Sequence, residues 1–152
     1  MKSIITRIAL ALLLIGMPFR SIPKVQAASQ CSNETLEGTY GGAATGFFIT
    51  ESQVVTGSVV HFAVAGTATF DGRGNISGGT TESIDGVIQQ GDTFEGTYTV
   101  KANCTGSTSF TGHHPGYIDH HNFDLVIVDG GKGIVLIETD AGVVFTITLT
   151  RQ

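Results

Sequence analysis

The chain has 152 residues, of which 41% are hydrophobic and 14% are charged, and its formal net charge at pH 7 is −5. Thirteen acidic residues outnumber eight basic ones. The net negative charge repels phosphate backbones, so we expect no nucleic-acid partner. The chain length suits one domain around one core.

The N-terminal segment has the pattern of a secretory signal peptide. Lys2 and Arg7 precede an uncharged apolar run, and a cleavage site follows Ala27. The run covers about 10 residues, whereas a bilayer-spanning helix needs about 20. We expect residues 1–27 to be the signal peptide and the mature protein, with four basic and thirteen acidic residues, to carry a net charge of −9. The predicted location is secreted or periplasmic, with no membrane insertion.

From residue 28 onward, apolar and polar residues alternate almost continuously, and Gly, Asp and Asn interrupt them at short intervals. A period of two indicates strands, and closely spaced turn residues join antiparallel neighbours. The pattern predicts eight strands, in chain order 36–48, 58–70, 75–85, 92–100, 104–111, 121–129, 133–139 and 142–150.

Strands joined in this order form a meander, and closing the sheet removes both of its edges. The expected fold class is all-β, with residues 28–152 forming a single domain, a closed eight-stranded antiparallel up-and-down barrel. Such a barrel is filled by side chains or holds one small ligand. A two-sheet sandwich is the competing architecture, but it needs long crossovers that are not evident here.

Alternation also predicts which aromatic side chains face the interior. Phe62 and Phe70 share one face of the second predicted strand, and Phe94 and Tyr98 share one face of the fourth. Phe145 lies in phase with the apolar residues of the last strand. If the interior is hollow, these five aromatic residues are the candidate ligand-binding side chains.

Cys31 and Cys104 are expected to form a disulfide in an oxidising compartment. The first and fifth strands begin at the same end of a meander, so this bond would draw residues 28–35 across that end. The opposite end would then be the only mouth. It is expected to carry the longer connections, 49–57, 86–91 and 112–120.

The sixth and seventh predicted strands contain runs that are apolar on both faces, at 125–128 and 134–137. This pattern is typical of a strand covered on both sides. The outer faces either meet another protomer, making a homo-oligomer through these two strands, or leave scattered apolar side chains on a monomer.

Residues 113–121 are rich in metal-ligand side chains. Imidazole and carboxylate groups suit zinc, copper or nickel, and a loop that folds back could bring three of them together. The candidate metal ligands are His113, His114, His120 and His121. Adjacent histidines in a strand point to opposite sides, however, so a solvated polar loop at the barrel mouth is the alternative.

Glu82 and Glu138 lie in phase with apolar residues of their strands. A carboxylate inside an apolar barrel would have a raised pKa and would suit general acid or base catalysis, whereas a bulge or a strand end would place it in water. The sequence contains no P-loop, dinucleotide fingerprint or nucleophile elbow, so no cofactor is expected.

Several segments of the mature chain consist mostly of turn and core residues: LEGTYG at 36–41, TFDGRGN at 69–75, FEGTY at 94–98, NCTG at 103–106, and 123–131 with 138–140. These segments resemble a family of small secreted bacterial β-barrel proteins of uncharacterised function. The resemblance spans nearly the whole mature chain and implies a shared barrel but no activity. More remotely, the arrangement is similar to allene oxide cyclase, dirigent-type and calycin barrels, in architecture only.

Three functions are expected from these features. The leading one is a secreted barrel that binds a small apolar ligand or has a structural role. The second is a cyclase or isomerase that holds an apolar substrate inside the barrel, with Glu82 or Glu138 as its acid or base. The third is metal binding through residues 113–121.

Overall fold

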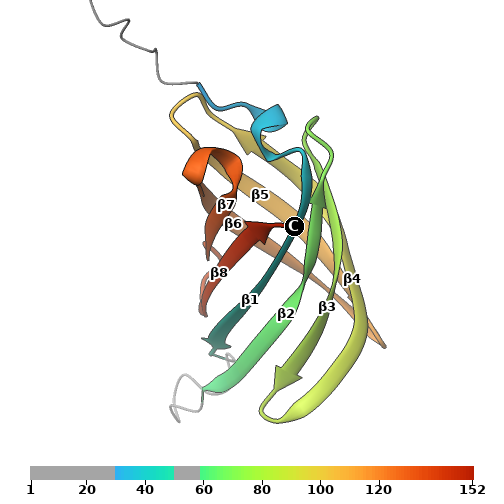
Figure 1. Cartoon of the computed structure of the whole chain (residues 1–152). Helices are drawn as coiled ribbons and strands as arrows, with labels where there is room; N and C mark the ends of the chain where they lie inside the picture. The colour runs from blue at the N-terminus through green and yellow to red at the C-terminus, as the bar shows by residue number, and fades with distance from the viewer. Residues whose placement is uncertain (1–29, 50–58) are drawn as a thin grey trace, which may run out of the picture.

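The structure is a computed structural model that describes residues 30–49 and 59–152, and it confirms the closed meander barrel (Figure 1). Each strand pairs antiparallel with the next, and β8 pairs back with β1. The strands are β1 (Gly38–Phe48), β2 (Val60–Phe70), β3 (Asn75–Ile84), β4 (Val87–Val100), β5 (Thr105–His114), β6 (Tyr117–Val128), β7 (Gly133–Glu138) and β8 (Val143–Arg151). Two short 3-10 helices, η1 (Asn33–Leu36) and η3 (Asp129–Gly131), complete the described elements.

Two connections that the sequence analysis expected to be long are tight turns, so this part of the prediction is wrong. Residues 87–91 belong to β4, and most of 112–120 belongs to β5 and β6. The turns themselves contain only Asp85-Gly86 and Pro115-Gly116. The polar side chains there suggested loops, but ladder hydrogen bonds join backbone groups and do not depend on side-chain polarity. The third expected connection, 49–57, lies almost wholly outside the described residues.

The barrel is filled at one end and hollow towards the other. Along β2, Ala68 and Phe70 are buried, whereas the inward-facing Phe62 and Val64 are only partly buried. At the filled end the ring of Phe70 packs edge to face against Tyr40 and Tyr98, with centroids 5.3 and 5.0 Å away. The core is therefore concentrated at the end where β1 begins.

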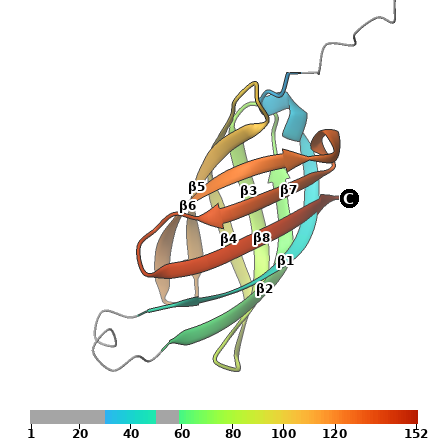
Figure 2. The same ribbon diagram turned by 90° about the vertical axis from the view of Figure 1, so that its left-hand side faces the viewer.

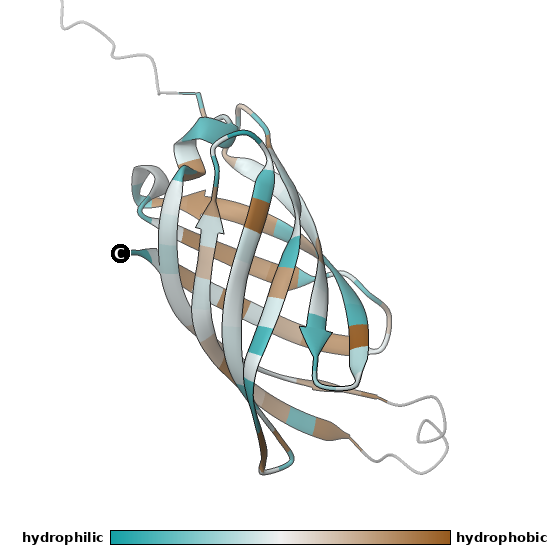
Figure 3. Cartoon of the chain, turned by 90° about the vertical axis from the view of Figure 1, so that its right-hand side faces the viewer, coloured by the Kyte–Doolittle hydropathy of each residue, from teal (hydrophilic) through white to brown (hydrophobic). Residues whose placement is uncertain are grey.

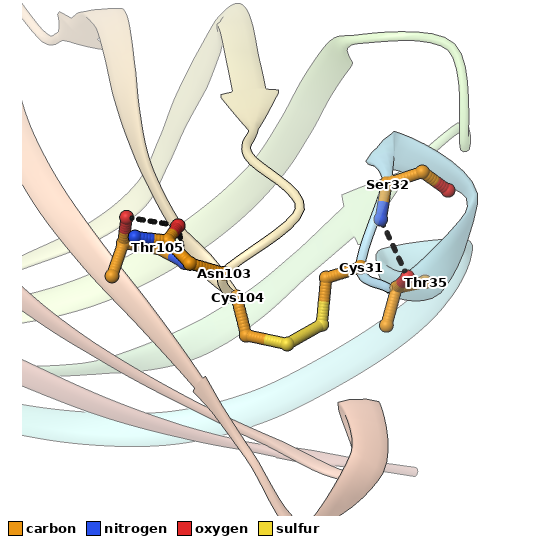
Figure 4. The surroundings of a disulfide bond; sticks show 6 residues. All are labelled: Cys31, Ser32, Thr35, Asn103, Cys104 and Thr105. Carbon is orange, nitrogen blue, oxygen red and sulfur yellow. Dashed lines mark hydrogen bonds between the residues drawn. A yellow bond between two sulfur atoms is a disulfide. The ribbon is translucent and has the colours of Figure 1, made fainter. Parts of the chain in front are cut away.

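The N-terminal segment closes this filled end, as predicted. The disulfide joins Cys31 to Cys104 with their Cα atoms 5.0 Å apart (Figure 4). Beyond it, the Asn33 side chain accepts a hydrogen bond from the backbone N–H of Val100 at 2.8 Å, and Leu36 is completely buried. Figure 2 shows η1 at one end of the barrel and the β3–β4 turn at the other. We call residues 31–37 the plug.

Arg151, near the C-terminus, fastens the plug to the barrel. Its guanidinium donates hydrogen bonds to the carbonyls of Glu37 (2.6 Å), Thr35 (2.9 Å) and Gly131 (3.2 Å). It also donates to the Tyr40 hydroxyl at 2.7 Å and lies over the Tyr40 ring, 5.0 Å from its centroid. A planar fork of donors can satisfy several acceptors at once, so one side chain holds the plug, β1 and η3 together.

The outer faces of β6 and β7 carry exposed apolar side chains. Val126, Val135 and Ile137 have exposed fractions of 48%, 41% and 54%. Figure 3 shows hydrophobic and hydrophilic bands along the barrel strands. The apolar outer face expected from the sequence therefore exists, and self-association through it stays a prediction.

The expected signal peptide, residues 1–27, lies outside the described residues. Within 30–49 and 59–152, no helix has the length and apolar character required to cross a membrane. The disulfide is compatible with an extracellular location. Secretion itself stays a prediction.

Replacing both cysteines, Cys31→Ser with Cys104→Ser, should lower the free energy of unfolding by about 4 kcal/mol, because the bond closes a long loop in the unfolded chain. The sequence separation is 73 residues. Urea denaturation of both proteins measures the difference. A loss below about 1 kcal/mol would show that hydrogen bonds alone hold the plug.

Arg151→Lys should lower the free energy of unfolding by about 1–2 kcal/mol, because an ammonium group cannot reach the same four acceptors. Arg73→Lys is the matched control, since Arg73 is exposed and only its backbone N–H is hydrogen-bonded among the described contacts. Equal stability of the two variants would contradict this role for Arg151.

Candidate functional site

A cavity of about 520 Å³ occupies the hollow part of the barrel and reaches the end opposite the plug. Cavities of roughly 300–1,000 Å³ hold small organic ligands in proteins. Most of the lining is apolar, and small residues such as Ala44 and Gly66 leave the space open. The structure therefore provides one interior chamber with one mouth among its described parts.

Three of the five predicted aromatic residues line this cavity: Phe62, Phe94 and Phe145. The rings of Phe62 and Phe145 pack edge to face with centroids 4.8 Å apart. Phe70 and Tyr98 also point inward, but they are buried in the filled end beyond the lining. Alternation predicted correctly that all five side chains face the barrel interior. Which of them reach the chamber depends on their depth along the barrel, which alternation does not give.

One wall of the chamber carries a row of alternating carboxylates and imidazoles from four neighbouring strands. Asp92 lies on β4, His114 on β5, Asp119 and His121 on β6, and Glu138 at the end of β7. His114 is 3.4 Å from Asp92 through Nδ1 and 3.2 Å from Asp119 through Nε2. His121 is 3.1 Å from Asp119 through Nε2 and 2.8 Å from Glu138 through Nδ1. We call these five residues the polar row.

A β-bulge places Asp92 in this row. Thr80 of β3 pairs with Asp92 and Thr81 pairs with Gln90, which leaves Gly91 between them without a partner. Gly91 has a φ of +80°, a conformation that glycine adopts without strain. A bulge shifts the alternation by one residue, so Asp92 and Gln89 both face the interior.

The β5–β6 hairpin places His114 and Asp119. The His114 ring stacks on Tyr117, with centroids 4.3 Å apart and planes 9° from parallel. Gly112 pairs with Asp119, and a Cβ at position 112 would collide with the Asp119 carboxylate and approach His114 Nε2. Glycine at this position therefore lets the carboxylate and the imidazole meet.

The four histidines proposed as metal ligands do not converge. His113 and His120 point outward: the His113 side chain is 46% exposed, and His120 Nδ1 lies 3.0 Å from the Thr111 hydroxyl. His114 and His121 point inward, and Asp119 lies between them. Because the segment is a hairpin and not a loop, alternation sends neighbouring histidines to opposite faces.

The two proposed catalytic carboxylates both point inward but differ in access. Glu82 of β3 lines the cavity. Burial raises its pKa, and the charge of His114 offsets only part of that rise. Glu138 is buried, accepts a hydrogen bond from His121 and is not among the cavity-lining residues. Only Glu82 is therefore placed to meet a molecule in the chamber.

The contacts within the polar row shift the pKa values of His121 and Asp119. Burial lowers the pKa of His121, but its contacts with Asp119 and Glu138 outweigh this and raise it to about 10. Burial likewise raises the pKa of Asp119, yet hydrogen bonds and charge from His121 and His114 leave it below its usual value. At neutral pH, His121 is therefore an imidazolium between two carboxylates.

Asp92 and Asp119 were not singled out from the sequence as functional residues. Asp92 does lie in phase with the inward Phe94, and this signal could have found it. Asp119 lies within the histidine segment, where nothing in the local pattern distinguishes it from its polar neighbours.

Comparisons of the chain with protein-family models, with curated proteins and with solved structures give no match. The resemblance to small secreted bacterial barrels therefore stays a prediction, and the site is interpreted from its own geometry.

The protonated His121 should make stability pH-dependent. Its pKa is raised from 6.5 to about 10, so its contribution is complete below pH 6.5 and is lost as the pH rises through 10. The free energy of unfolding should fall over this interval, and His121→Gln should remove most of that slope. His120→Gln, its outward-facing neighbour, should keep it. An equal slope in both variants would show that another group titrates.

Proposed function

We propose that this protein binds a small, mainly apolar molecule inside the barrel, which enters through the end opposite the plug. The observation that carries the proposal is the cavity of about 520 Å³ with its largely apolar lining. Natural cores are packed to the density of organic crystals, so a chamber of this size is not ordinary imperfect packing. Because unfilled apolar space destabilises a fold, a cavity maintained at this size is typical of a ligand site.

The lining indicates the chemistry of the ligand. Phe62, Phe94 and Phe145 provide aromatic surface for an apolar body. On one wall, the polar residues that line the cavity are Glu82, His114, Asp119 and His121. A molecule with an apolar body and one polar end would match both parts. A polar end that donates hydrogen bonds fits this wall, because the carboxylates of Glu82 and Asp119 can accept them.

The surroundings of the mouth support the passage of an apolar molecule. Val87, Ile88 and Ile118 flank the two hairpin turns at this end and have exposed fractions of 64%, 60% and 62%. Apolar residues are seldom gathered at exposed hairpin tips without a function. These exposed apolar side chains would lower the free-energy barrier for moving an apolar ligand from its source into the chamber.

An enzymatic role as a cyclase or isomerase is the second candidate, and one observation favours it. Glu82 borders the cavity and has a raised pKa, which is the position and the acidity that such chemistry would need. Glu138, the other carboxylate considered for this role, is turned towards His121 and away from the chamber.

Titration with the neutral fluorescent probe N-phenyl-1-naphthylamine tests ligand binding. The probe should bind to the wild-type protein, and Ala44→Phe should weaken binding at least about tenfold by filling the chamber. Ala44 is buried and lines the cavity, whereas Thr148 of β8 is exposed and is not among the lining residues, so Thr148→Phe is the control. Circular dichroism checks that both variants fold.

Two outcomes would contradict the proposal. The first is equal probe binding by Ala44→Phe and Thr148→Phe, which would place the probe on the outer surface. The second is no thermal stabilisation of the wild-type protein by any member of a library of lipids, terpenoids and pigments. If Ala44→Phe does not fold, Val64→Phe takes its place, because Val64 also lines the cavity.

A further inference from the structure

The buried Asp92 carboxylate forms no hydrogen bond among the described residues, although His114 Nδ1 lies 3.4 Å from one of its oxygens. The Asp92 side chain is 1% exposed. His114 Nδ1, which faces it, has no hydrogen-bond partner in the same part of the chain. Buried polar atoms in folded proteins are almost always satisfied, so these atoms point to a bound species.

A third ligand atom lies beside them. Glu82, Asp92 and His114 each offer one ligand atom, and these atoms all lie within 4.8 Å of one another. Asp92 Oδ2 and His114 Nδ1 are 3.4 Å apart. Two ligands about 2.1 Å from a tetrahedral zinc ion are themselves about 3.4 Å apart. The separation is thus long for a hydrogen bond and suited to two ligands of one metal ion.

The other ring nitrogen of His114 is held as in a metal site. Nε2 lies 3.2 Å from the Asp119 carboxylate, so in the neutral imidazole it is the nitrogen that carries the proton, and Nδ1 is the one that can bind a metal ion. Metal-binding histidines generally donate their second N–H to a carboxylate, which fixes the tautomer and the ring orientation. Asp119 is fixed by His121, and the His114 ring is stacked on Tyr117. The ring is therefore oriented before any ion binds.

We propose that Glu82, Asp92 and His114 bind a divalent transition-metal ion in the wall of the cavity. Two carboxylates and one neutral imidazole carry a charge of about −2, which a dication neutralises. A mixed nitrogen and oxygen set suits Zn²⁺ or Mn²⁺, whereas Mg²⁺ and Ca²⁺ prefer oxygen ligands alone. Glu82 and His114 line the cavity, so the remaining coordination positions face the chamber. This site does not depend on the apolar ligand proposed above.

The test is calorimetric titration of the untagged, chelator-treated protein with Zn²⁺, Mn²⁺ and Mg²⁺. We expect micromolar or tighter binding of Zn²⁺ or Mn²⁺ at one site and at least about tenfold weaker binding of Mg²⁺. Asp92→Asn keeps the side-chain shape and removes the charge, so it should weaken binding of the transition metal at least about tenfold. The double variant Glu95→Gln with His113→Gln is the matched control, since these residues come from the same two strands but lie on the outer face.

Three outcomes would overturn the proposal: no binding by the wild-type protein, equal affinity for Mg²⁺, or unchanged affinity in Asp92→Asn. If Asp92→Asn does not fold, His114→Gln replaces it with the same expectation. Cobalt(II) gives a second readout, because its visible absorption bands report a bound ion with nitrogen and oxygen ligands. These bands should appear in the wild type and in the control and be absent from Asp92→Asn.

Discussion

Pairing of β1 with β8 is the interaction on which the rest of the structure depends. The two strands pair along nine residue positions, from Tyr40 with Arg151 to Phe48 with Val143. This ladder removes the last two edges of the sheet and turns eight meandering strands into a wall with an inside. It also brings Arg151 next to the start of β1, so the same pairing that closes the wall positions the guanidinium that fastens the plug.

The two ends of the barrel differ because, within 30–49 and 59–152, only one of them receives chain from outside the wall. At the plug end, Leu36 and the rings of Tyr40 and Phe70 fill the interior, and the disulfide keeps the N-terminal segment in place. At the other end, tight turns join β3 to β4 and β5 to β6 and contribute no chain to cover the interior, and residues 50–58 between β1 and β2 lie outside the described part of the chain. The position of the cavity therefore follows from the topology, and the small residues along β1 and β2 set its width.

The sequence was sufficient to predict the barrel, the disulfide, the end that the plug closes and the inward direction of Phe62. All of these depend on a period of two and on counting strands, and turn residues mark both well. For Glu82 and Glu138, the sequence left an inward and a solvent-exposed position open. The bulge at Gly91 and the hairpin around Gly116 were not predicted. A single glycine in a polar run has the same appearance in a turn, a bulge or a loop, and only the pairing partner distinguishes these cases.

The polar row could not be predicted because its members come from four strands and meet through register, which local patterns do not encode. Asp92, His114, Asp119 and Glu138 each keep a buried side-chain atom without a hydrogen bond among the described residues, so such atoms occur along the row. Glu138 and Asp119 contact His121 from both sides, so the positive charge of its imidazolium is compensated within the protein. The contact between Asp119 and His114 Nε2 orients the ring so that Nδ1 faces Asp92. Among the described residues, no hydrogen-bond donor reaches the Asp92 oxygens. The atoms of Asp92 and His114 that lack hydrogen bonds therefore lie close to Glu82, beside the chamber.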